Sequence, residues 1–189
     1  MKVGLYFGSF NPIHIGHCII ANHVASHTDL AQVWLMVSPQ NPFKISGSLL
    51  NEYHRLHLAK VAIEGESSLR VSDIEFHLPR PSFTVDTLAY LQEKHPQHIF
   101  AIILGSDSFQ NLGKWKNANI IIRDHEIYVY TRAGFPVENS INAKITLLDA
   151  PLLQISSTRI REYIREKKSI RYLVPDKVKE EIERNAYYK

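Results

Sequence analysis

Apolar runs without strict polar alternation recur along the chain, separated by segments whose apolar residues repeat with helical spacing. Short runs rich in Val, Ile and Leu are typical of strands that are covered on both faces. Strands are expected at 2–7, 33–37, 69–76, 98–104, 126–131 and 145–148. Helices are expected at 15–27, 52–63, 86–94, 115–122, 157–165 and 175–185.

This alternation predicts an α/β fold: a Rossmann-like, open, mainly parallel sheet with helices on both faces and a helical C-terminal segment. The chain has 189 residues, 44% of them hydrophobic, and shows neither repeats nor a linker. We therefore expect a single domain over residues 1–189. Because ligands of such sheets bind beyond the carboxyl ends of the strands, the residues that follow each strand are the candidates for chemistry.

The segment GSFNPIHIGH, residues 8–17, directly follows the first predicted strand. Gly8 and Ser9 allow a tight turn, and His14 and His17 lie three residues apart at a helix start, so both imidazoles share one helix face. The free N–H groups of a helix start favour an anion. The segment predicts a nucleotide-phosphate site; the alternative is an ordinary turn before a helix with histidines that only pack.

A second candidate segment, SSTRIR at 156–161, precedes a predicted helix near the end of the chain. Ser156 or Ser157 is expected to cap that helix, which makes its start a second anion site. Arg159 and Arg161 add guanidinium groups suited to phosphate oxygens. The alternative is a capped helix with a solvated basic face.

Together the two segments carry a family resemblance. GSFNPIHIGH resembles the signature of the HIGH-motif nucleotidyltransferases, and ISSTRIR at 155–161 resembles their second signature. In this order, near the two ends of the chain, they most resemble the bacterial nicotinate-nucleotide adenylyltransferases, and the likeness runs nearly end to end. The chain departs from that family at Phe7, where Gly is more usual, and at Asn11, where Asp is more usual. We expect Phe7 to reshape the nucleotide loop.

The resemblance implies an enzyme of NAD biosynthesis that moves AMP from ATP to nicotinate mononucleotide and releases pyrophosphate. It implies catalytic roles for His14, His17 and Arg161. Contacts to ATP are expected from Gly8, Ser9, Phe10, His14, His17, Ser156, Ser157, Thr158 and Arg161. The attacking phosphate is already an anion, so the enzyme needs alignment and charge neutralisation rather than a general base. Mg²⁺ is expected as a cofactor held mainly by the ATP phosphates, with no metal site of the protein's own.

The acceptor is expected to bind through the middle of the chain. The segment PSFTVDTL, 81–88, resembles the part of the family that holds the pyridine carboxylate through backbone amides near Thr84; otherwise Thr84 or Asp86 simply caps a helix. Trp115 could stack on a flat ring, or else belong to the core or a lid. The residues expected to contact the mononucleotide are Lys44, Thr84, Asp107, Trp115 and Arg132.

Composition narrows the classes of partner. The formal charge of +3 suits an anionic substrate but is too small to argue for nucleic acid. No apolar run reaches the ~20 residues of a membrane helix, so no membrane partner is expected. The lone cysteine, Cys18, excludes an internal disulfide and suits the cytoplasm. The alternatives are a phosphopantetheine adenylyltransferase or another HIGH-motif enzyme, and a non-catalytic nucleotide-binding module. Oligomeric state, a homo-oligomer included, and closure of the loops 38–51 and 106–117 stay open.

Overall fold

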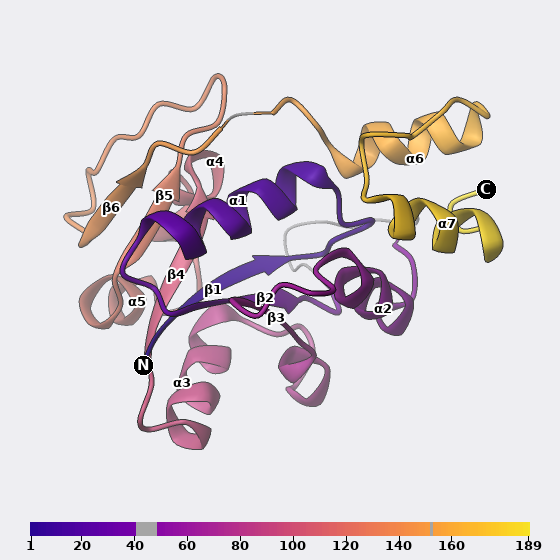
Figure 1. Cartoon of the computed structure of the whole chain (residues 1–189). Helices are drawn as coiled ribbons and strands as arrows, with labels where there is room; N and C mark the ends of the chain where they lie inside the picture. The colour runs from indigo at the N-terminus through magenta and orange to yellow at the C-terminus, as the bar shows by residue number, and fades with distance from the viewer. Residues whose placement is uncertain (41–48, 152) are drawn as a thin grey trace.

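The computed structural model describes residues 1–40, 49–151 and 153–189 and contains one six-stranded sheet with helices on both faces (Figure 1). The strand order is β3-β2-β1-β4-β5-β6. The strands are β1 (Lys2–Gly8), β2 (Gln32–Val37), β3 (Leu69–Ser72), β4 (Ile99–Gly105), β5 (Ile127–Tyr130) and β6 (Ile145–Leu148). Each of these pairings is parallel, which confirms the Rossmann-like expectation.

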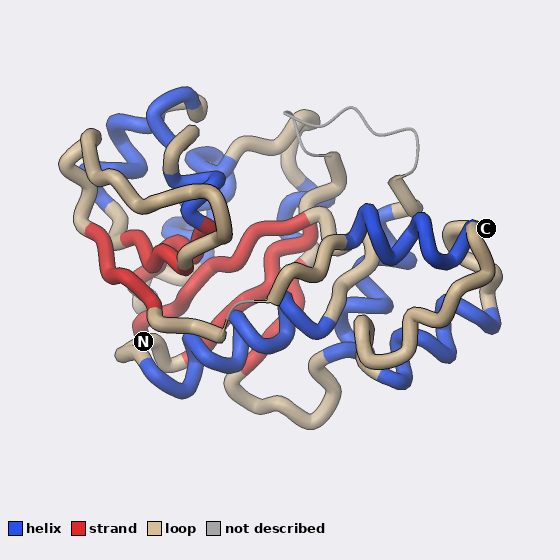
Figure 2. Tube along the Cα trace, turned by 90° about the horizontal axis from the view of Figure 1, so that it is seen from above, coloured by secondary structure: helices blue, strands red, loops and turns tan. Residues whose placement is uncertain are grey.

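Helices connect the strands and complete the C-terminal part of the chain. They are α1 (Ile15–His27), α2 (Glu52–Ala62), α3 (Thr84–Lys94), α4 (Ser106–Phe109), α5 (Ala118–Asp124), α6 (Ser157–Arg165) and α7 (Asp176–Arg184), with short 3-10 turns η1 (Ile74–His77) and η2 (Leu112–Lys114). α1 lies over one face of the sheet and α3 over the other, while α6 and α7 lie beyond the carboxyl end of the strands (Figures 1 and 2). None of the helices in the described ranges is long and apolar enough to span a membrane.

The core consists of two layers because neighbouring residues of a strand point to opposite faces. On β1, the buried Tyr6 belongs to the layer under α1, whereas Leu5 belongs to the layer under α3. The first layer continues into α7 through Val178 and Ile182. The C-terminal helices therefore share a hydrophobic core with the sheet.

Two predicted elements differ from the structure. The strand expected over 69–76 ends at Ser72, and the chain then forms η1, which buries Glu75. The helix expected from residue 115 begins at Ala118 instead, because Asn117 before it has a left-handed φ of 50° that cannot continue a helix.

The crevice for a ligand lies between β1 and β4. β2 lies on one side of β1 and β4 on the other, so the direction of the crossovers reverses at this point. Open α/β sheets bind ligands at such a reversal, beyond the carboxyl ends of the strands. The segments that follow Gly8 and Gly105 flank it.

Candidate active site

The phosphate loop, defined here as residues 8–14, connects β1 to α1. Phe10 adopts a left-handed φ of 45° and is 2% exposed. Its ring packs edge-on against Tyr6 at 5.9 Å and His17 at 5.0 Å between centroids. A Cβ atom at Gly8 would lie 2.8 Å from the Phe10 ring. Only glycine therefore fits at residue 8 while Phe10 keeps its position.

His14 and His17 form a reciprocal cap at the start of α1. His14 Nδ1 accepts from the backbone N–H of His17 at 3.4 Å, and His17 Nδ1 accepts from the N–H of His14 at 3.3 Å. The rings stack with centroids 3.6 Å apart. Because Nδ1 is the acceptor in each ring, the proton of the neutral ring lies on Nε2, which makes Nε2–H a donor.

His14 is a neutral donor at physiological pH. Burial, aided by the positive charge of Arg132, lowers the pKa of His14 to about 4. The imidazole thus offers a hydrogen bond rather than a full positive charge to a phosphate. Arg132 follows β5, so the charge that acts on His14 comes from the other side of the crevice.

Side chains of α6 hold the phosphate loop by its carbonyl groups. Ser157 Oγ donates to the Pro12 carbonyl at 2.9 Å, and Arg161 Nη1 donates to the Asn11 carbonyl at 2.7 Å. The two segments singled out from the sequence are thus in contact, although the bonded residues lie 145 and 150 positions apart in the chain. The starts of α1 and α6 lie side by side at the carboxyl edge of the sheet.

At the start of α6, Ser156 is the N-cap, and its Oγ accepts from the N–H of Arg159 at 3.2 Å. Thr158 is exposed, and its Oγ1 accepts from Arg161 Nη2 at 3.4 Å. Arg161 Nε is buried and has no hydrogen-bond partner among the described residues, and burial lowers the pKa of this guanidinium. Arg159 is exposed and pairs with Glu162 at 3.0 Å.

Arg55 on α2 is a residue that the sequence reasoning missed. It is 0% exposed and donates from Nη1 to the carbonyls of Ser9 at 2.5 Å and Ser38 at 2.8 Å. It also donates to the carbonyls of Pro39 at 2.9 Å and Leu50 at 2.7 Å. One guanidinium therefore joins the phosphate loop to the segment after β2.

A sequence signal for Arg55 existed. Arg55, Leu58 and Ala59 are all buried and follow the i, i+3, i+4 spacing of one helix face. An arginine at a core position of an amphipathic helix needs internal acceptors, because a buried guanidinium without partners is costly.

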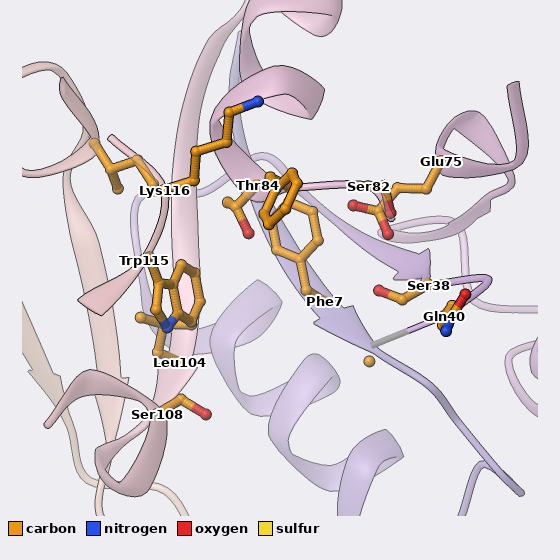
Figure 3. Close-up of a pocket in the computed structure, with 13 residues that line it drawn as sticks. Phe7, Ser38, Gln40, Glu75, Ser82, Thr84, Leu104, Ser108, Trp115 and Lys116 are labelled. Carbon is orange, nitrogen blue, oxygen red and sulfur yellow. The ribbon is translucent and has the colours of Figure 1, made fainter. Parts of the chain in front are cut away.

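A cavity of about 130 Å³ opens between the start of α3 and the ends of β1, β2 and β4 (Figure 3). A dry cavity of ~150 Å³ holds a benzene ring, so this one has the size for a single six-membered ring. Its labelled lining residues are Phe7, Ser38, Gln40, Glu75, Ser82, Thr84, Leu104, Ser108, Trp115 and Lys116.

The start of α3 reaches this pocket without a side-chain cap. Phe83 is the N-cap and Thr84 the first helical residue, so the alternative in which Thr84 or Asp86 simply caps the helix is wrong. Asp86 instead pairs with Lys116 at 2.8 Å. The first N–H groups of a helix have no partners inside it, so this uncapped end suits a carboxylate.

Aromatic side chains line the same pocket. The ring of Trp115 faces its interior in Figure 3, opposite Phe7. We expected Phe7 to reshape the nucleotide loop; in the structure its side chain lines this pocket. Trp115 belongs to a pocket wall rather than to the start of a helix.

Asp107 and Arg132 form an ion pair of 3.0 Å on the β4–β5 side of the crevice. The Arg132 N–H donates to Ser106 Oγ at 2.8 Å, which fixes the turn after β5. A Cβ at Gly105 would lie 2.6 Å from Asp107 Oδ1 and 2.9 Å from Arg132 Cδ. The sequence-predicted acceptor residues Asp107 and Arg132 are thus neighbours. Lys44 lies outside the described residues.

The chain is similar to known proteins over its whole length. The cytidylyltransferase-like family matches residues 5–163. A probable nicotinate-nucleotide adenylyltransferase of Flavobacterium psychrophilum is 50% identical over the full length of both chains. One from Bacteroides thetaiotaomicron is 44% identical over 96% of this chain and 91% of its own.

Solved structures show the same fold. A Plasmodium falciparum nicotinic acid mononucleotide adenylyltransferase complexed with NaAD superposes with a TM-score of 0.85 at 22% identity, covering 99% of this chain and 97% of its own. The same enzyme complexed with APC gives 0.84, covering 99% and 96%. The sequence resemblance is confirmed, and the chain belongs to the cytidylyltransferase-like family and, within it, to the nicotinate-nucleotide adenylyltransferases.

Proposed function

We propose that this protein transfers AMP from ATP to nicotinate mononucleotide in NAD biosynthesis, giving nicotinate adenine dinucleotide and pyrophosphate. The observation that carries the proposal is that Ser157 and Arg161 hold the start of α6 against the loop before α1. Beside this junction lies a pocket of the size of one ring, lined by the start of α3, which has no side-chain cap. The names of the relatives, which match this chain over nearly its whole length, support it.

The reaction needs no proton abstraction. An oxygen of the mononucleotide phosphate forms a bond to the α-phosphorus of ATP, and the bond from that phosphorus to the bridging oxygen of pyrophosphate breaks. The Nε2–H groups of His14 and His17 donate to phosphate oxygens, and the Arg161 guanidinium neutralises charge that develops on them. Ser156, Ser157 and Thr158 place the start of α6 against the triphosphate, while Gly8, Ser9 and Phe10 shape the loop on which it lies.

The acceptor fills the opposite side of the crevice. Its ring stacks on Trp115, and its carboxylate accepts hydrogen bonds from the N–H groups at Thr84. Asp107 accepts from ribose hydroxyls, and Arg132, with Lys44, binds the phosphate. Because Arg132 also acts on the pKa of His14, its position suits an acceptor phosphate directed at the ATP side.

Mg²⁺ accompanies ATP in this proposal. In the described part of the chain, no three potential metal-ligating side chains gather in one place. A magnesium ion would be held by the phosphate oxygens of ATP, where it would neutralise charge on the reacting phosphates. A single domain and a cytoplasmic location remain predictions from the sequence, and a homo-oligomer remains open.

Release of pyrophosphate tests the proposal. Purified protein would be supplied with ATP, Mg²⁺ and one acceptor at a time: nicotinate mononucleotide, nicotinamide mononucleotide or phosphopantetheine. Fast release with nicotinate mononucleotide is expected. Release only with phosphopantetheine would make this a sister enzyme, and ATP binding without release would make it a non-catalytic module.

A further inference from the structure

The acceptor pocket contains a buried carboxyl group that the proposed chemistry does not use. Glu75 on η1 is 3% exposed, and its Oε1 accepts from Thr87 Oγ1 at 2.9 Å. Among the described residues, Glu75 Oε2 and the neighbouring Ser82 Oγ are buried, and neither forms a hydrogen bond of good geometry. Figure 3 shows these two side chains next to each other in the pocket wall.

No cation of the described residues neutralises Glu75. The lysine that lines the same pocket, Lys116, forms its ion pair with Asp86 at 2.8 Å. Burial raises the pKa of Glu75 above its usual value, against the lowering effect of nearby hydroxyl groups. These hydroxyls belong to Thr87 on α3 and to Ser38 and Ser82 in the loops beside it. Burial therefore shifts Glu75 toward its neutral carboxylic acid form.

A neutral Glu75 completes a wall of hydrogen-bond donors. Its Oε1 already accepts from Thr87, so the proton lies on Oε2, which can donate. The first N–H groups of α3, at Thr84, are donors as well. A ring carboxylate brings acceptors only and suits such a wall. A carboxamide would turn its NH₂ donors toward other donors or leave them unpaired.

We propose that Glu75 determines the preference of this pocket for the ring acid over the ring amide, by donating a hydrogen bond from Oε2 to the substrate. The proposal rests on the proposed function, since it concerns the acceptor of that reaction. Loss of the proton converts Glu75 from a donor into an anionic acceptor. It then repels a carboxylate and accepts from a carboxamide, so the preference for the acid falls as pH rises.

The test is the ratio of kcat/KM for nicotinate mononucleotide to kcat/KM for nicotinamide mononucleotide, measured over roughly pH 5 to 9, a range that covers the raised pKa values known for buried glutamates. Both acceptors carry the same phosphate and react with the same ATP, so other titrations cancel in the ratio. In the wild type we expect the ratio to fall by at least about tenfold across this range, since a mismatched donor or acceptor in a buried site discriminates strongly. In Glu75→Gln, which cannot ionise, we expect a flat ratio.

Glu93→Gln, at an exposed glutamate of α3, is the matched control and should retain the wild-type profile. A flat ratio in the wild type would overturn the proposal without any variant, as would a Glu75→Gln profile that still falls with pH. If neither mononucleotide turns over, the proposed function itself fails; turnover with an unchanging ratio refutes only the role of Glu75.

Discussion

Replacing Arg55 with methionine should destabilise the protein strongly, because one side chain serves four carbonyl groups. Counting about 1–3 kcal/mol for each acceptor left without a donor gives about 4–12 kcal/mol. Removing a buried charge that has no ion-pair partner among the described residues offsets part of this loss. Subtracting about 1 kcal/mol for the charge removed from the low end of this range gives a net loss of about 3 kcal/mol or more. The whole free energy of unfolding of a domain is only about 5–15 kcal/mol.

Urea unfolding followed by circular dichroism measures this loss. Arg55→Lys retains the charge but not the planar fork, so it should lose less than Arg55→Met and still fall below the wild type. Arg123→Met, which removes an exposed ion pair with Asp124, is the control and should leave the free energy of unfolding close to the wild-type value. A loss below about 1 kcal/mol for Arg55→Met would refute the inference that Arg55 holds the loops together.

Two further predictions concern His14. A Cβ at Gly16 would lie 3.1 Å from His14 Nδ1 and 3.2 Å from its Cε1, so Gly16→Ala should shift the His14 ring and lower kcat/KM about tenfold. We expect this loss even though alanine stabilises a helix by up to about 1 kcal/mol relative to glycine. Unchanged turnover in steady-state assays would contradict a role for the position of the His14 ring. The pKa of His14 is about 4 in the folded protein and 6.5 in the unfolded chain, so between these values only the unfolded chain binds the proton. The free energy of unfolding should therefore fall by about 3 kcal/mol as the pH drops from about 6.5 to about 4. His14→Gln should lack this part of the pH dependence in urea titrations, and parallel curves for the two proteins would contradict the buried neutral imidazole.

The sequence was sufficient for the sheet because buried parallel strands have a local signature. The apolar runs that became β1, β2 and β4 carry no polar alternation, and glycine follows two of them at the carboxyl edge. The start of α6 was equally legible, since a serine before a helix is a local signal; Ser156 rather than Ser157 proved to be the N-cap.

What the sequence could not supply depends on contacts between distant segments. A strand pattern over 69–76 does not show that Glu75 turns inward to meet Thr87. The N-cap position of α3 is occupied by Phe83, whose side chain forms no capping hydrogen bond. By residue type Thr84 and Asp86 are better caps, so the sequence did not indicate a helix start without a side-chain cap. The planar ring of Trp115 suggested stacking on a flat substrate ring, but its place opposite Phe7 in the pocket required the fold (Figure 3).

The most direct test of the central claim measures dinucleotide and pyrophosphate together, from ATP and nicotinate mononucleotide, for the wild type and His17→Ala. The wild type should form one nicotinate adenine dinucleotide per pyrophosphate, and His17→Ala should lower kcat about 10²–10³-fold, as loss of a transition-state donor does. His27→Ala, at an exposed histidine of the same helix, should leave kcat unchanged. Pyrophosphate without dinucleotide, or a His17→Ala enzyme within tenfold of the wild type, would contradict the account.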